Sequence, residues 1–396
     1  MSKRNASGGD VPGAIVLGGD YQGLGIVRSL GRHGVPVCVI DDEHSIARVS
    51  RYTGCWARIA DLGDEEKLVE DLLRIGRERG LEGWVLFPTR DETVAAIARN
   101  RERLAGVFRV PTAGWETIRW AWDKRSTYEL AESLGVPAPR TWQPASLDQL
   151  EEIDAQPPFA VKPAIKEHFF YATGAKAWRA DSVEELRDLV AKATDIVGSG
   201  EVLVQELIPG DGQQQYAYCA LYEDGEPVAT MVARRLRQHP PEFGRASTYV
   251  ETIDEPQVEE LSRRLLGHIR FSGLVELEFK RDPRTGAFKL LDFNARTWGY
   301  HTIAGQAGVD FPYLLYRRQL EQPVEPQRTR SGVSWVRILT DLPTAIAEIC
   351  RGRLRAGDYL RSLRRAQVEA VFSREDPLPG LAELALIPYL VFKRSA

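Results

Sequence analysis

The stretch LVELEFKRDPRTGAFKLLDFNAR (residues 274–296) decides the fold prediction for this chain, because it is typical of a hairpin that crowds acidic side chains together. Apolar and charged residues alternate from Val275 to Lys280, which is the period of two expected for a half-buried strand. The segment Asp282–Gly286 (DPRTG) has the composition of a short turn. A second strand is therefore predicted from about Ala287 to Phe293.

The predicted pairing brings three acids and an amide onto one face of the hairpin. If Arg281 pairs near Ala287, residues of the same parity share a face, and these are Glu276, Glu278, Asp292 and Asn294. Directly opposite Cβ atoms lie roughly 4.5–5.5 Å apart, and carboxylates at that spacing are costly unless protons or a cation intervene. Oxygen ligands suit Mg²⁺ or Mn²⁺, which leave positions for substrate phosphates. The alternative is a solvated face on which Lys280 and Lys289 pair with the acids. Asn294 and Arg296 favour the metal site, since they add a neutral oxygen ligand and an anion-binding cation.

The size and composition indicate a soluble, cytoplasmic protein of two or three domains. Of the 396 residues, 43% are hydrophobic and 27% are charged. A net charge of −4 argues against a nucleic acid or an anionic membrane as the main partner. No stretch approaches the roughly 20 apolar residues that span a bilayer. The four cysteines are scattered without metal-site spacing, which favours a reducing compartment over a disulfide framework.

Strands and helices alternate in the first 115 residues, which predicts a parallel, doubly wound sheet. The strands are expected at 14–19, 35–41 and 83–88, and the helices near 24–33, 64–79 and 91–104. Ligands of such sheets bind beyond the carboxyl ends of the strands, where Gly19, Asp20, Asp91 and Glu92 are expected. The glycines after the first strand fit G-x-G-x-x-G poorly, but Asp41 and Asp42 follow the second strand, so NAD binding stays an alternative.

Two lysines in the middle of the chain have two interpretations each. Lys124 begins a predicted helix (123–134) and is either solvated or compensated by a local charge. Lys162 ends the strand FAVKP (159–163) and is either an edge charge or a cation aimed at a phosphate. The strand EVLVQELIPG (201–210) is either a plain core strand or a backbone that reads a purine. Other predicted elements are helices at 183–193 and 258–269, a hairpin turn at 223–225 and a mostly helical remainder after residue 319.

Several segments, taken in order, resemble the ATP-grasp superfamily: AWDKRSTYELAESLGVPAPRT (121–141), FAVKP (159–163), VLVQELIPG (202–210), VELEFK (275–280) and LLDFNAR (290–296). The resemblance covers roughly residues 14–315 and is strongest to carboxylate–amine ligases similar to D-aspartate ligase and the carbamoyl-phosphate synthase large subunit. It implies a multidomain α/β and α+β fold. The implied parts are a pre-ATP-grasp α/β domain (1–115), a linker helix and lid domain (116–205), a nucleotide and metal domain (206–320) and a helical extension (321–396).

The resemblance also implies ATP and Mg²⁺ (or Mn²⁺) as cofactors. Contacts with ATP are implied for Lys124 and Lys162 at the phosphates, Glu206, Leu207 and Ile208 at the adenine, and Asp211 or Gln213 at the ribose. The implied metal ligands are Glu278, Asp292 and Asn294. The residues implied to hold the transferred phosphate or a substrate carboxylate are Arg296, Arg235 and Arg237. Substrate contacts from the first domain are implied for Gly19, Asp20, Asp91 and Glu92.

The implied reaction joins a small-molecule carboxylate to an amine through an acyl phosphate and releases ADP and phosphate. Two positions depart from the superfamily pattern. The lid loop PAIKEHFFYATGAKA (163–177) has one glycine where a glycine-rich run is common. Either Lys166, His168 and Lys176 bind phosphate instead, or the lid is specialised. Asp292 stands where a glutamate is usual. The alternatives are a non-catalytic ATP-binding regulatory protein on the same scaffold and an NAD-dependent enzyme. The oligomeric state stays open, with a homodimer as one candidate.

Overall fold

The computed structural model describes residues 11–395, except 211, 241–242 and 245, and it divides into two compact units. The N-terminal unit comprises the residues up to 114 together with 310–325 and those from 371 onward. The central unit comprises residues 115–309 and 326–370. The N-terminal unit is therefore built from three separate segments of the chain.

The N-terminal unit contains the predicted parallel sheet, with strand order β3-β2-β1-β4. The strands are β1 (Ala14–Leu17), β2 (Val37–Asp41), β3 (Cys55–Arg58) and β4 (Val85–Pro88). The helices are α1 (Tyr21–Arg32), α2 (Glu65–Arg79), α3 (Asp91–Arg99), α4 (Arg101–Ala105), α11 (Phe311–Gln319) and α14 (Leu378–Ser395), with a 3₁₀ turn at Ala47–Val49. The predicted doubly wound fold is confirmed. The edge strand β3 was missed, because its four residues (CWAR) are too few to show a period.

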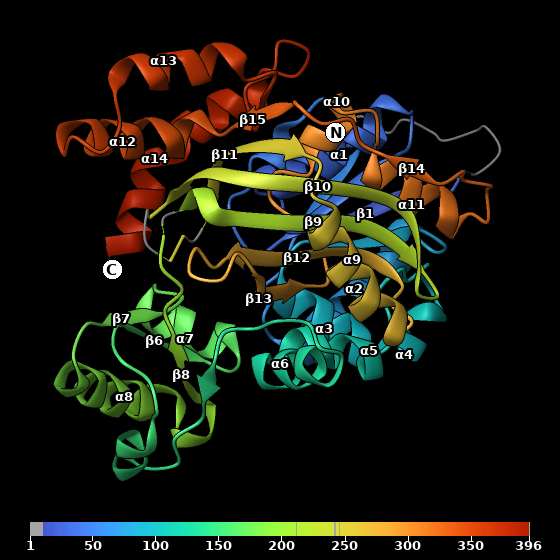
Figure 1. The fold of residues 1–396 in the computed structure, drawn as a ribbon. Helices are drawn as coiled ribbons and strands as arrows, with labels where there is room; N and C mark the ends of the chain where they lie inside the picture. The colour runs from blue at the N-terminus through green and yellow to red at the C-terminus, as the bar shows by residue number, and fades with distance from the viewer. Residues whose placement is uncertain (1–10, 211, 241–242, 245, 396) are drawn as a thin grey trace. The chain divides into compact units, whose positions relative to one another are not determined.

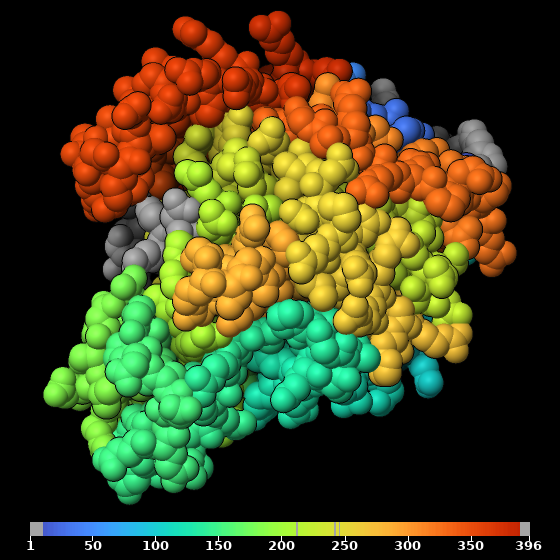
Figure 2. Space-filling view, in the orientation of Figure 1, coloured from blue at the N-terminus to red at the C-terminus, as the bar shows by residue number. Residues whose placement is uncertain are grey.

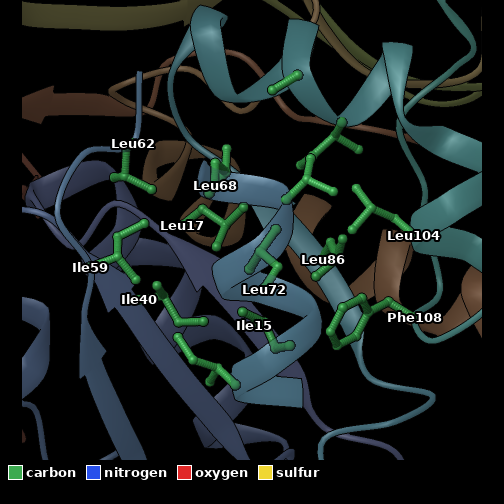
Figure 3. Close-up of a cluster of buried hydrophobic side chains, with 14 of the residues drawn as sticks. Ile15, Leu17, Ile40, Ile59, Leu62, Leu68, Leu72, Leu86, Leu104 and Phe108 are labelled. Atoms are coloured by element: carbon green, nitrogen blue, oxygen red, sulfur yellow. The ribbon is translucent and has the colours of Figure 1, made fainter. Parts of the chain in front are cut away.

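Apolar side chains from the strands and helices of this unit interdigitate in one core (Figure 3). The strands contribute Ile15, Leu17, Ile40 and Leu86, and helices α2 and α4 with the segment after them contribute Leu68, Leu72, Leu104 and Phe108. Removing this apolar surface from water supplies roughly 25 cal/mol per Å². Helix α2 begins where the Asp64 carboxylate accepts from the Lys67 amide and ends at Gly80, whose φ of 65° is left-handed.

One buried carboxylate ties the last segment of the chain to the first. Asp376 accepts from Arg28 Nε at 3.0 Å, from Ser50 Oγ at 2.7 Å and from the Arg51 amide at 2.9 Å. Both Asp376 and Arg28 are buried, so this charge is paired and hydrogen-bonded out of water. The segment from residue 371 is thus an integral part of the N-terminal unit.

The register of β2 and β3 brings two cysteines together that are distant in the sequence. Cys38 lies directly opposite Cys55 in the parallel pairing, and both thiols are free. A hydrogen bond from Cys38 lowers the pKa of the Cys55 thiol to about 7, while the same bond and burial raise the pKa of Cys38.

The central unit is organised around an eight-stranded sheet (Figure 1). Its order is β13-β12-β9-β10-β11-β15-β16, and β14 pairs beside β10. The strands are β9 (Gln215–Glu223), β10 (Glu226–His239), β11 (Ala246–Ile253), β12 (Gly273–Arg281), β13 (Phe288–Asn294), β14 (Gln327–Arg328), β15 (Ser334–Val336) and β16 (Val368–Glu369). The predicted turn between β9 and β10 is confirmed: Asp224 and Gly225 have φ of 49° and 85°, as a two-residue hairpin loop requires.

A smaller four-stranded sheet forms in the segment that was predicted to be the lid, and it belongs to the green lobe in Figure 2. Its order is β5-β8-β6-β7, from β5 (Thr141–Trp142), β8 (Val202–Glu206), β6 (Phe159–Pro163) and β7 (Trp178–Ala180). Helix α8 (Val183–Val197) packs on it, and 3₁₀ turns lie at Leu147–Glu152 and Ser199–Glu201. The stretch expected as an atypical lid loop forms helix α7 (Lys166–Thr173), which ends at Gly174 with φ of 68°.

The remaining helices of the central unit are α5 (Trp115–Trp122), α6 (Lys124–Ser133), α9 (Pro256–His268), α10 (Thr302–Gln306), α12 (Ile338–Cys350) and α13 (Ala356–Arg365), with a 3₁₀ turn at Gly212–Gln214. The predicted start of α6 is confirmed, since the Asp123 carboxylate accepts from the Arg125 amide at 2.9 Å. The helical remainder is confirmed too, apart from the short strands β14 to β16. None of the helices in the described part of the chain combines the length and the apolar character needed to cross a bilayer.

Candidate functional site

The hairpin of β12 and β13 holds the predicted acids on one face, but through a different pairing from the predicted one. Arg281 pairs with Phe288, one residue later than expected. The register then shifts: Phe279 pairs with Leu290, Glu278 with Asp292 and Glu276 with Asn294. Leu291 is therefore a β-bulge, the extra residue on one strand. Without it, the register at the turn would send Asp292 to the face opposite Glu278. The shared face is confirmed, and the predicted register is corrected.

Helix α6 contacts β13 at this bulge through two side chains that lie one helical turn apart. The Lys124 ammonium donates to the Asp292 carboxylate. The Tyr128 hydroxyl donates to the Leu291 carbonyl oxygen at 2.9 Å. Residues four apart lie on the same face of a helix, so one turn of α6 fixes both the bulge and the acid that follows it. The interpretation of Lys124 as a charge compensated locally is confirmed.

The three acids have different protonation tendencies. Glu276 is 4% exposed, and it accepts from Tyr300 Oη at 2.6 Å and from Asn294 Nδ2 at 3.2 Å. Burial, together with the charge of Glu278, raises the pKa of Glu276 to about 7. Burial also acts to raise the pKa of Asp292, but Lys124 and nearby lysines lower it to about 2. The pKa of Glu278 is lowered as well, because Arg235 and Lys176 outweigh burial. Glu278 and Asp292 are therefore ionised at neutral pH.

Six cationic side chains act on these three acids. Arg235 Nη2 donates to Glu278 at 3.0 Å, and Arg296 Nη2 donates to Asn294 Oδ1 at 3.3 Å. The cations whose charges act on the carboxylates or that contact them are Lys124, Lys162, Lys166, Lys176, Arg235 and Arg296. Such an excess of partly desolvated positive charge favours an anionic ligand.

Lys162 is an interior cation and not an edge charge. Its strand β6 lies between β8 and β7, and the residue is 8% exposed. Its ammonium donates to Tyr128 Oη at 2.6 Å and to Gln205 Oε1 at 2.7 Å. Burial, with a contribution from Lys124, lowers the pKa of Lys162. A lysine has three N–H donors, so these two bonds leave one for a ligand.

Comparisons with known proteins agree with this arrangement. A family model described as "ATP-grasp in the biosynthetic pathway with Ter operon" matches residues 201–340. D-aspartate ligase from Enterococcus faecium (strain Aus0004) is 23% identical over 299 residues, which cover 71% of this chain and 70% of that protein. The crystal structure of an L-amino acid ligase from Bacillus licheniformis matches with a TM-score of 0.63 and 17% identity, and covers 84% of this chain and 79% of that one. The chain has the ATP-grasp fold.

A third relative carries a nucleotide. The biotin carboxylase domain of Hydrogenobacter thermophilus 2-oxoglutarate carboxylase, solved with MgADP, matches with a TM-score of 0.64 and 14% identity, and covers 81% of this chain and 73% of that one. The predicted resemblance and fold class are confirmed. Two of these proteins, D-aspartate ligase and the L-amino acid ligase, are named as ligases, which is the enzyme class that the sequence predicts for this chain.

The predicted metal ligands are two opposed carboxylates and an amide. The described part of the chain contains no group of three or more His, Cys, Asp or Glu residues arranged to hold a metal. Glu278 and Asp292 are nevertheless ionised oxygen donors in directly opposite positions, which suits Mg²⁺. Asn294 turns its amide nitrogen toward Glu276 and Glu278. The amide would therefore have to rotate by half a turn to present its oxygen to a metal.

The segment predicted to meet the adenine is already engaged through several polar groups. The Glu206 carboxylate binds Lys289 and accepts from Arg284 Nη2 at 3.1 Å. The Leu207 amide donates to Pro158 O at 3.2 Å, and the Ile208 carbonyl accepts from Lys280 Nζ at 2.8 Å. The Ile208 amide and the Leu207 carbonyl are not among these engaged groups of the described residues. Gln213 lies in the 3₁₀ turn after the segment, and Asp211 falls outside the described residues. Contacts of all these residues with ATP stay predictions.

The two predicted arginines of β10 have different partners. Arg235 joins the acid cluster, and it also donates to Gln215 Oε1 at 2.7 Å. Arg237 donates to both carboxylate oxygens of Asp341 on α12, at 2.8 and 2.7 Å. Its guanidinium lies 4.3 Å from the Tyr249 ring centroid and 5.1 Å from that of Tyr359. A bulge at Leu236 separates the two arginines. Arg237 thus fastens α12 to the sheet, and its catalytic role stays a prediction.

The predicted substrate residues of the N-terminal unit lie at the ends of its strands, as expected. The Gly19 amide donates to Asp41 Oδ2 at 2.6 Å, and Asp20 caps α1. Asp91 and Glu92 are the first two residues of α3. Asp41, the acid that favoured the NAD alternative, also pairs with Arg90 at 3.3 Å. The roles of Gly19, Asp20, Asp91 and Glu92 toward a substrate stay predictions.

Sequence reasoning missed several side chains that contact the residues around the acid cluster, among them Tyr128, Gln205 and Tyr300. Of these three, only Tyr128 had a signal, because it follows Lys124 by four residues on a predicted helix. Gln205 and Tyr300 reach the site through long-range packing, which single-strand patterns do not display.

Proposed function

We propose that this chain is an ATP-dependent ligase that joins a small-molecule carboxylate to an amine through an acyl phosphate. The observation that carries the proposal is the pair of ionised carboxylates, Glu278 and Asp292, directly opposite each other within a ring of cations. The three acids do not balance the positive charge of these cations, and the triphosphate of a nucleotide would supply the missing negative charge. A bound divalent cation would withdraw charge from the phosphate oxygens, with Glu278, Asp292 and the rotated Asn294 as its ligands.

The polar side chains would act by positioning and by electrostatics. Lys162 offers its third N–H to a phosphate oxygen from the lid side. Lys124 is bound to Asp292, and it lies close enough to Lys162 for its charge to lower the pKa of that lysine. The fork of Arg296 is suited to a planar or tetrahedral anion, which makes it the best candidate to hold the transferred phosphoryl group. Arg235 keeps Glu278 ionised and adds a second fixed charge.

The proposed reaction has two covalent steps, and neither needs a covalent bond between the protein and the substrate. A substrate carboxylate oxygen attacks the γ-phosphorus of ATP, and the bond to the ADP oxygen breaks. The amine nitrogen then attacks the acyl carbon, phosphate leaves with the bonding electron pair, and the extra amine proton is lost to solvent. In both steps, the fixed cations offset charge on the transferring group.

The test is ADP release from MgATP with a panel of carboxylates and amines, with the product identified by mass spectrometry. Glu278→Gln and Asp292→Asn should each lower the rate by about 100-fold or more, because a metal contact is lost. Glu260→Gln is the control: this acid is exposed on α9 and pairs with Arg264 at 2.9 Å.

Two outcomes would contradict the proposal. Wild-type rates of ADP release from both acid variants would remove the metal assignment. MgATP binding without turnover on any carboxylate and amine would favour a regulatory ATP-binding protein instead. A thermal-shift comparison of MgATP with NADH separates the NAD alternative, since only the nucleotide that binds the folded state raises the melting temperature.

A further inference from the structure

Tyr128 connects the lid sheet to the strand that carries Asp292. Its hydroxyl accepts from Lys162 Nζ at 2.6 Å and donates to the Leu291 carbonyl at 2.9 Å. The ring also lies under the Lys162 ammonium, whose nitrogen is 4.9 Å from the ring centroid. One buried side chain thus touches a predicted phosphate-binding lysine and the backbone beside a predicted metal ligand.

The bond to Leu291 matters because Leu291 is the bulge residue. A bulged residue is left out of the strand pairing, and the parity of everything after it depends on the bulge staying in place. Asp292 and Asn294 face Glu278 and Glu276 because of that single extra residue. The Tyr128 hydroxyl gives the Leu291 carbonyl a hydrogen-bond partner at the point where the strand ladder is interrupted.

We propose that Tyr128 is a positioning residue that fixes the position of Lys162 relative to Asp292. The phosphate-binding lysine and the metal-binding carboxylate can then contact the same nucleotide at the same time. The inference rests on the proposed function and deepens it. Tyr128 would not touch ATP or the metal. It would act through the Lys162 ammonium on one side and through the bulge on the other.

The connection continues into the lid through Gln205. Gln205 Oε1 accepts from Lys162 at 2.7 Å, and its Nε2 donates to Thr141 Oγ1 at 2.7 Å. The Lys162 ammonium is therefore held by two fixed acceptors, which orients its remaining N–H. Loss of the Tyr128 hydroxyl would leave the ammonium with one acceptor and the Leu291 carbonyl without this bond, while the ring volume stays the same.

The experiment replaces Tyr128 by phenylalanine in the full chain. MgATP binding by calorimetry and Mn²⁺ binding by electron paramagnetic resonance with ATP present should both weaken by about 10–100-fold, which is the usual effect of removing a group that orients a ligand residue. The concentration of Mg²⁺ that half-activates turnover should rise in parallel. In a double-mutant cycle with Lys162→Met, the loss of ATP-binding free energy in the double variant should be smaller than the sum of the losses in the two single variants.

Tyr222→Phe is the matched control. It removes another buried tyrosine hydroxyl of the same unit, one that lies 3.0 Å from Tyr218 Oη on the other face of the sheet. Equal losses of nucleotide and metal affinity in both variants would overturn the inference, because they would reflect a general loss of stability. Unchanged affinities in Tyr128→Phe, with an active wild type, would also overturn it and leave the proposed function intact. A wild type that binds no MgATP would instead reject the proposed function itself.

Discussion

Replacement of Glu276 by glutamine should stabilise the protein increasingly as the pH rises from 5 to 8. Glu276 has a pKa of about 7 in the folded chain, raised by burial and by the charge of Glu278, against 4.5 for an ordinary glutamate. The folded state therefore holds this proton more tightly than the unfolded state. The stability that Glu276 contributes is fully present below pH 4.5 and is lost as the pH rises through about 7. Glutamine resembles the protonated acid and loses nothing over this range.

The size of the effect follows from the two pKa values. With 1.36 kcal/mol for each pH unit, the difference between 4.5 and about 7 corresponds to about 3 kcal/mol. The glutamine side chain also keeps an acceptor for Tyr300, whose hydroxyl lies 2.6 Å from the Glu276 carboxylate. Denaturant unfolding of wild type and variant, in parallel from pH 5 to 8 in metal-free buffer, measures the difference in unfolding free energy.

Glu278→Gln is the matched control, because this acid lies two residues away and its pKa is lowered instead. The stability contributed by Glu278 is present above pH 4.5 and is lost as the pH falls, so its variant should be least stable, relative to wild type, at neutral pH. A difference for Glu276→Gln that stays flat or falls between pH 5 and 8 would refute the reasoning.

Two further predictions concern residues outside the acid cluster. Arg237→Ala should lower the free energy of unfolding by about 3–5 kcal/mol, because fully buried Asp341 loses its charged partner; Arg237→Lys should recover only part, since an ammonium lacks the two-pronged fork. Denaturant unfolding measures both, and Arg234→Lys, whose ion pair with Glu251 spans 3.9 Å, is the control that should change little. Alkylation of Cys55, followed by peptide mass spectrometry, should reach half its maximal rate near pH 7, where its thiolate forms. In Cys38→Ala that midpoint should rise, because the hydrogen bond that lowers the pKa is removed, and a wild-type midpoint near 9 would contradict the assignment.

The alternation of residue types was enough to predict the strands of the site and their shared acidic face. The register was not accessible in the same way, because it depends on the turn geometry and on a bulge that helix α6 stabilises from elsewhere in the chain. Leu291 is an ordinary apolar residue in the sequence, and its role appears only when Tyr128 is seen beside it.

Arg235 and Arg237 show a similar limit. Their spacing of two predicts a common face of β10, yet Leu236 interrupts the pairing and Asp341 engages the second arginine from a distant helix. Lys162 was recognisable as a candidate, since a lysine at the end of an apolar strand is either an edge charge or a cation that binds an anionic ligand. Its burial and its two acceptors depend on β8 and α6, which its own strand does not specify.

The carboxylate of Asp376 has a consequence for biosynthesis. Because it closes contacts with Arg28, Ser50 and Arg51, the first unit of the chain lacks a buried ion pair until the ribosome has translated the whole central unit. Domains usually fold in order of synthesis. Here, however, α11 and α14 of the N-terminal unit are translated only after residues 115–309, so the unit cannot be completed before then. A truncation after residue 114 would therefore lack the Asp376 contacts and two of the three segments that build this unit, so it would not be a minimal domain.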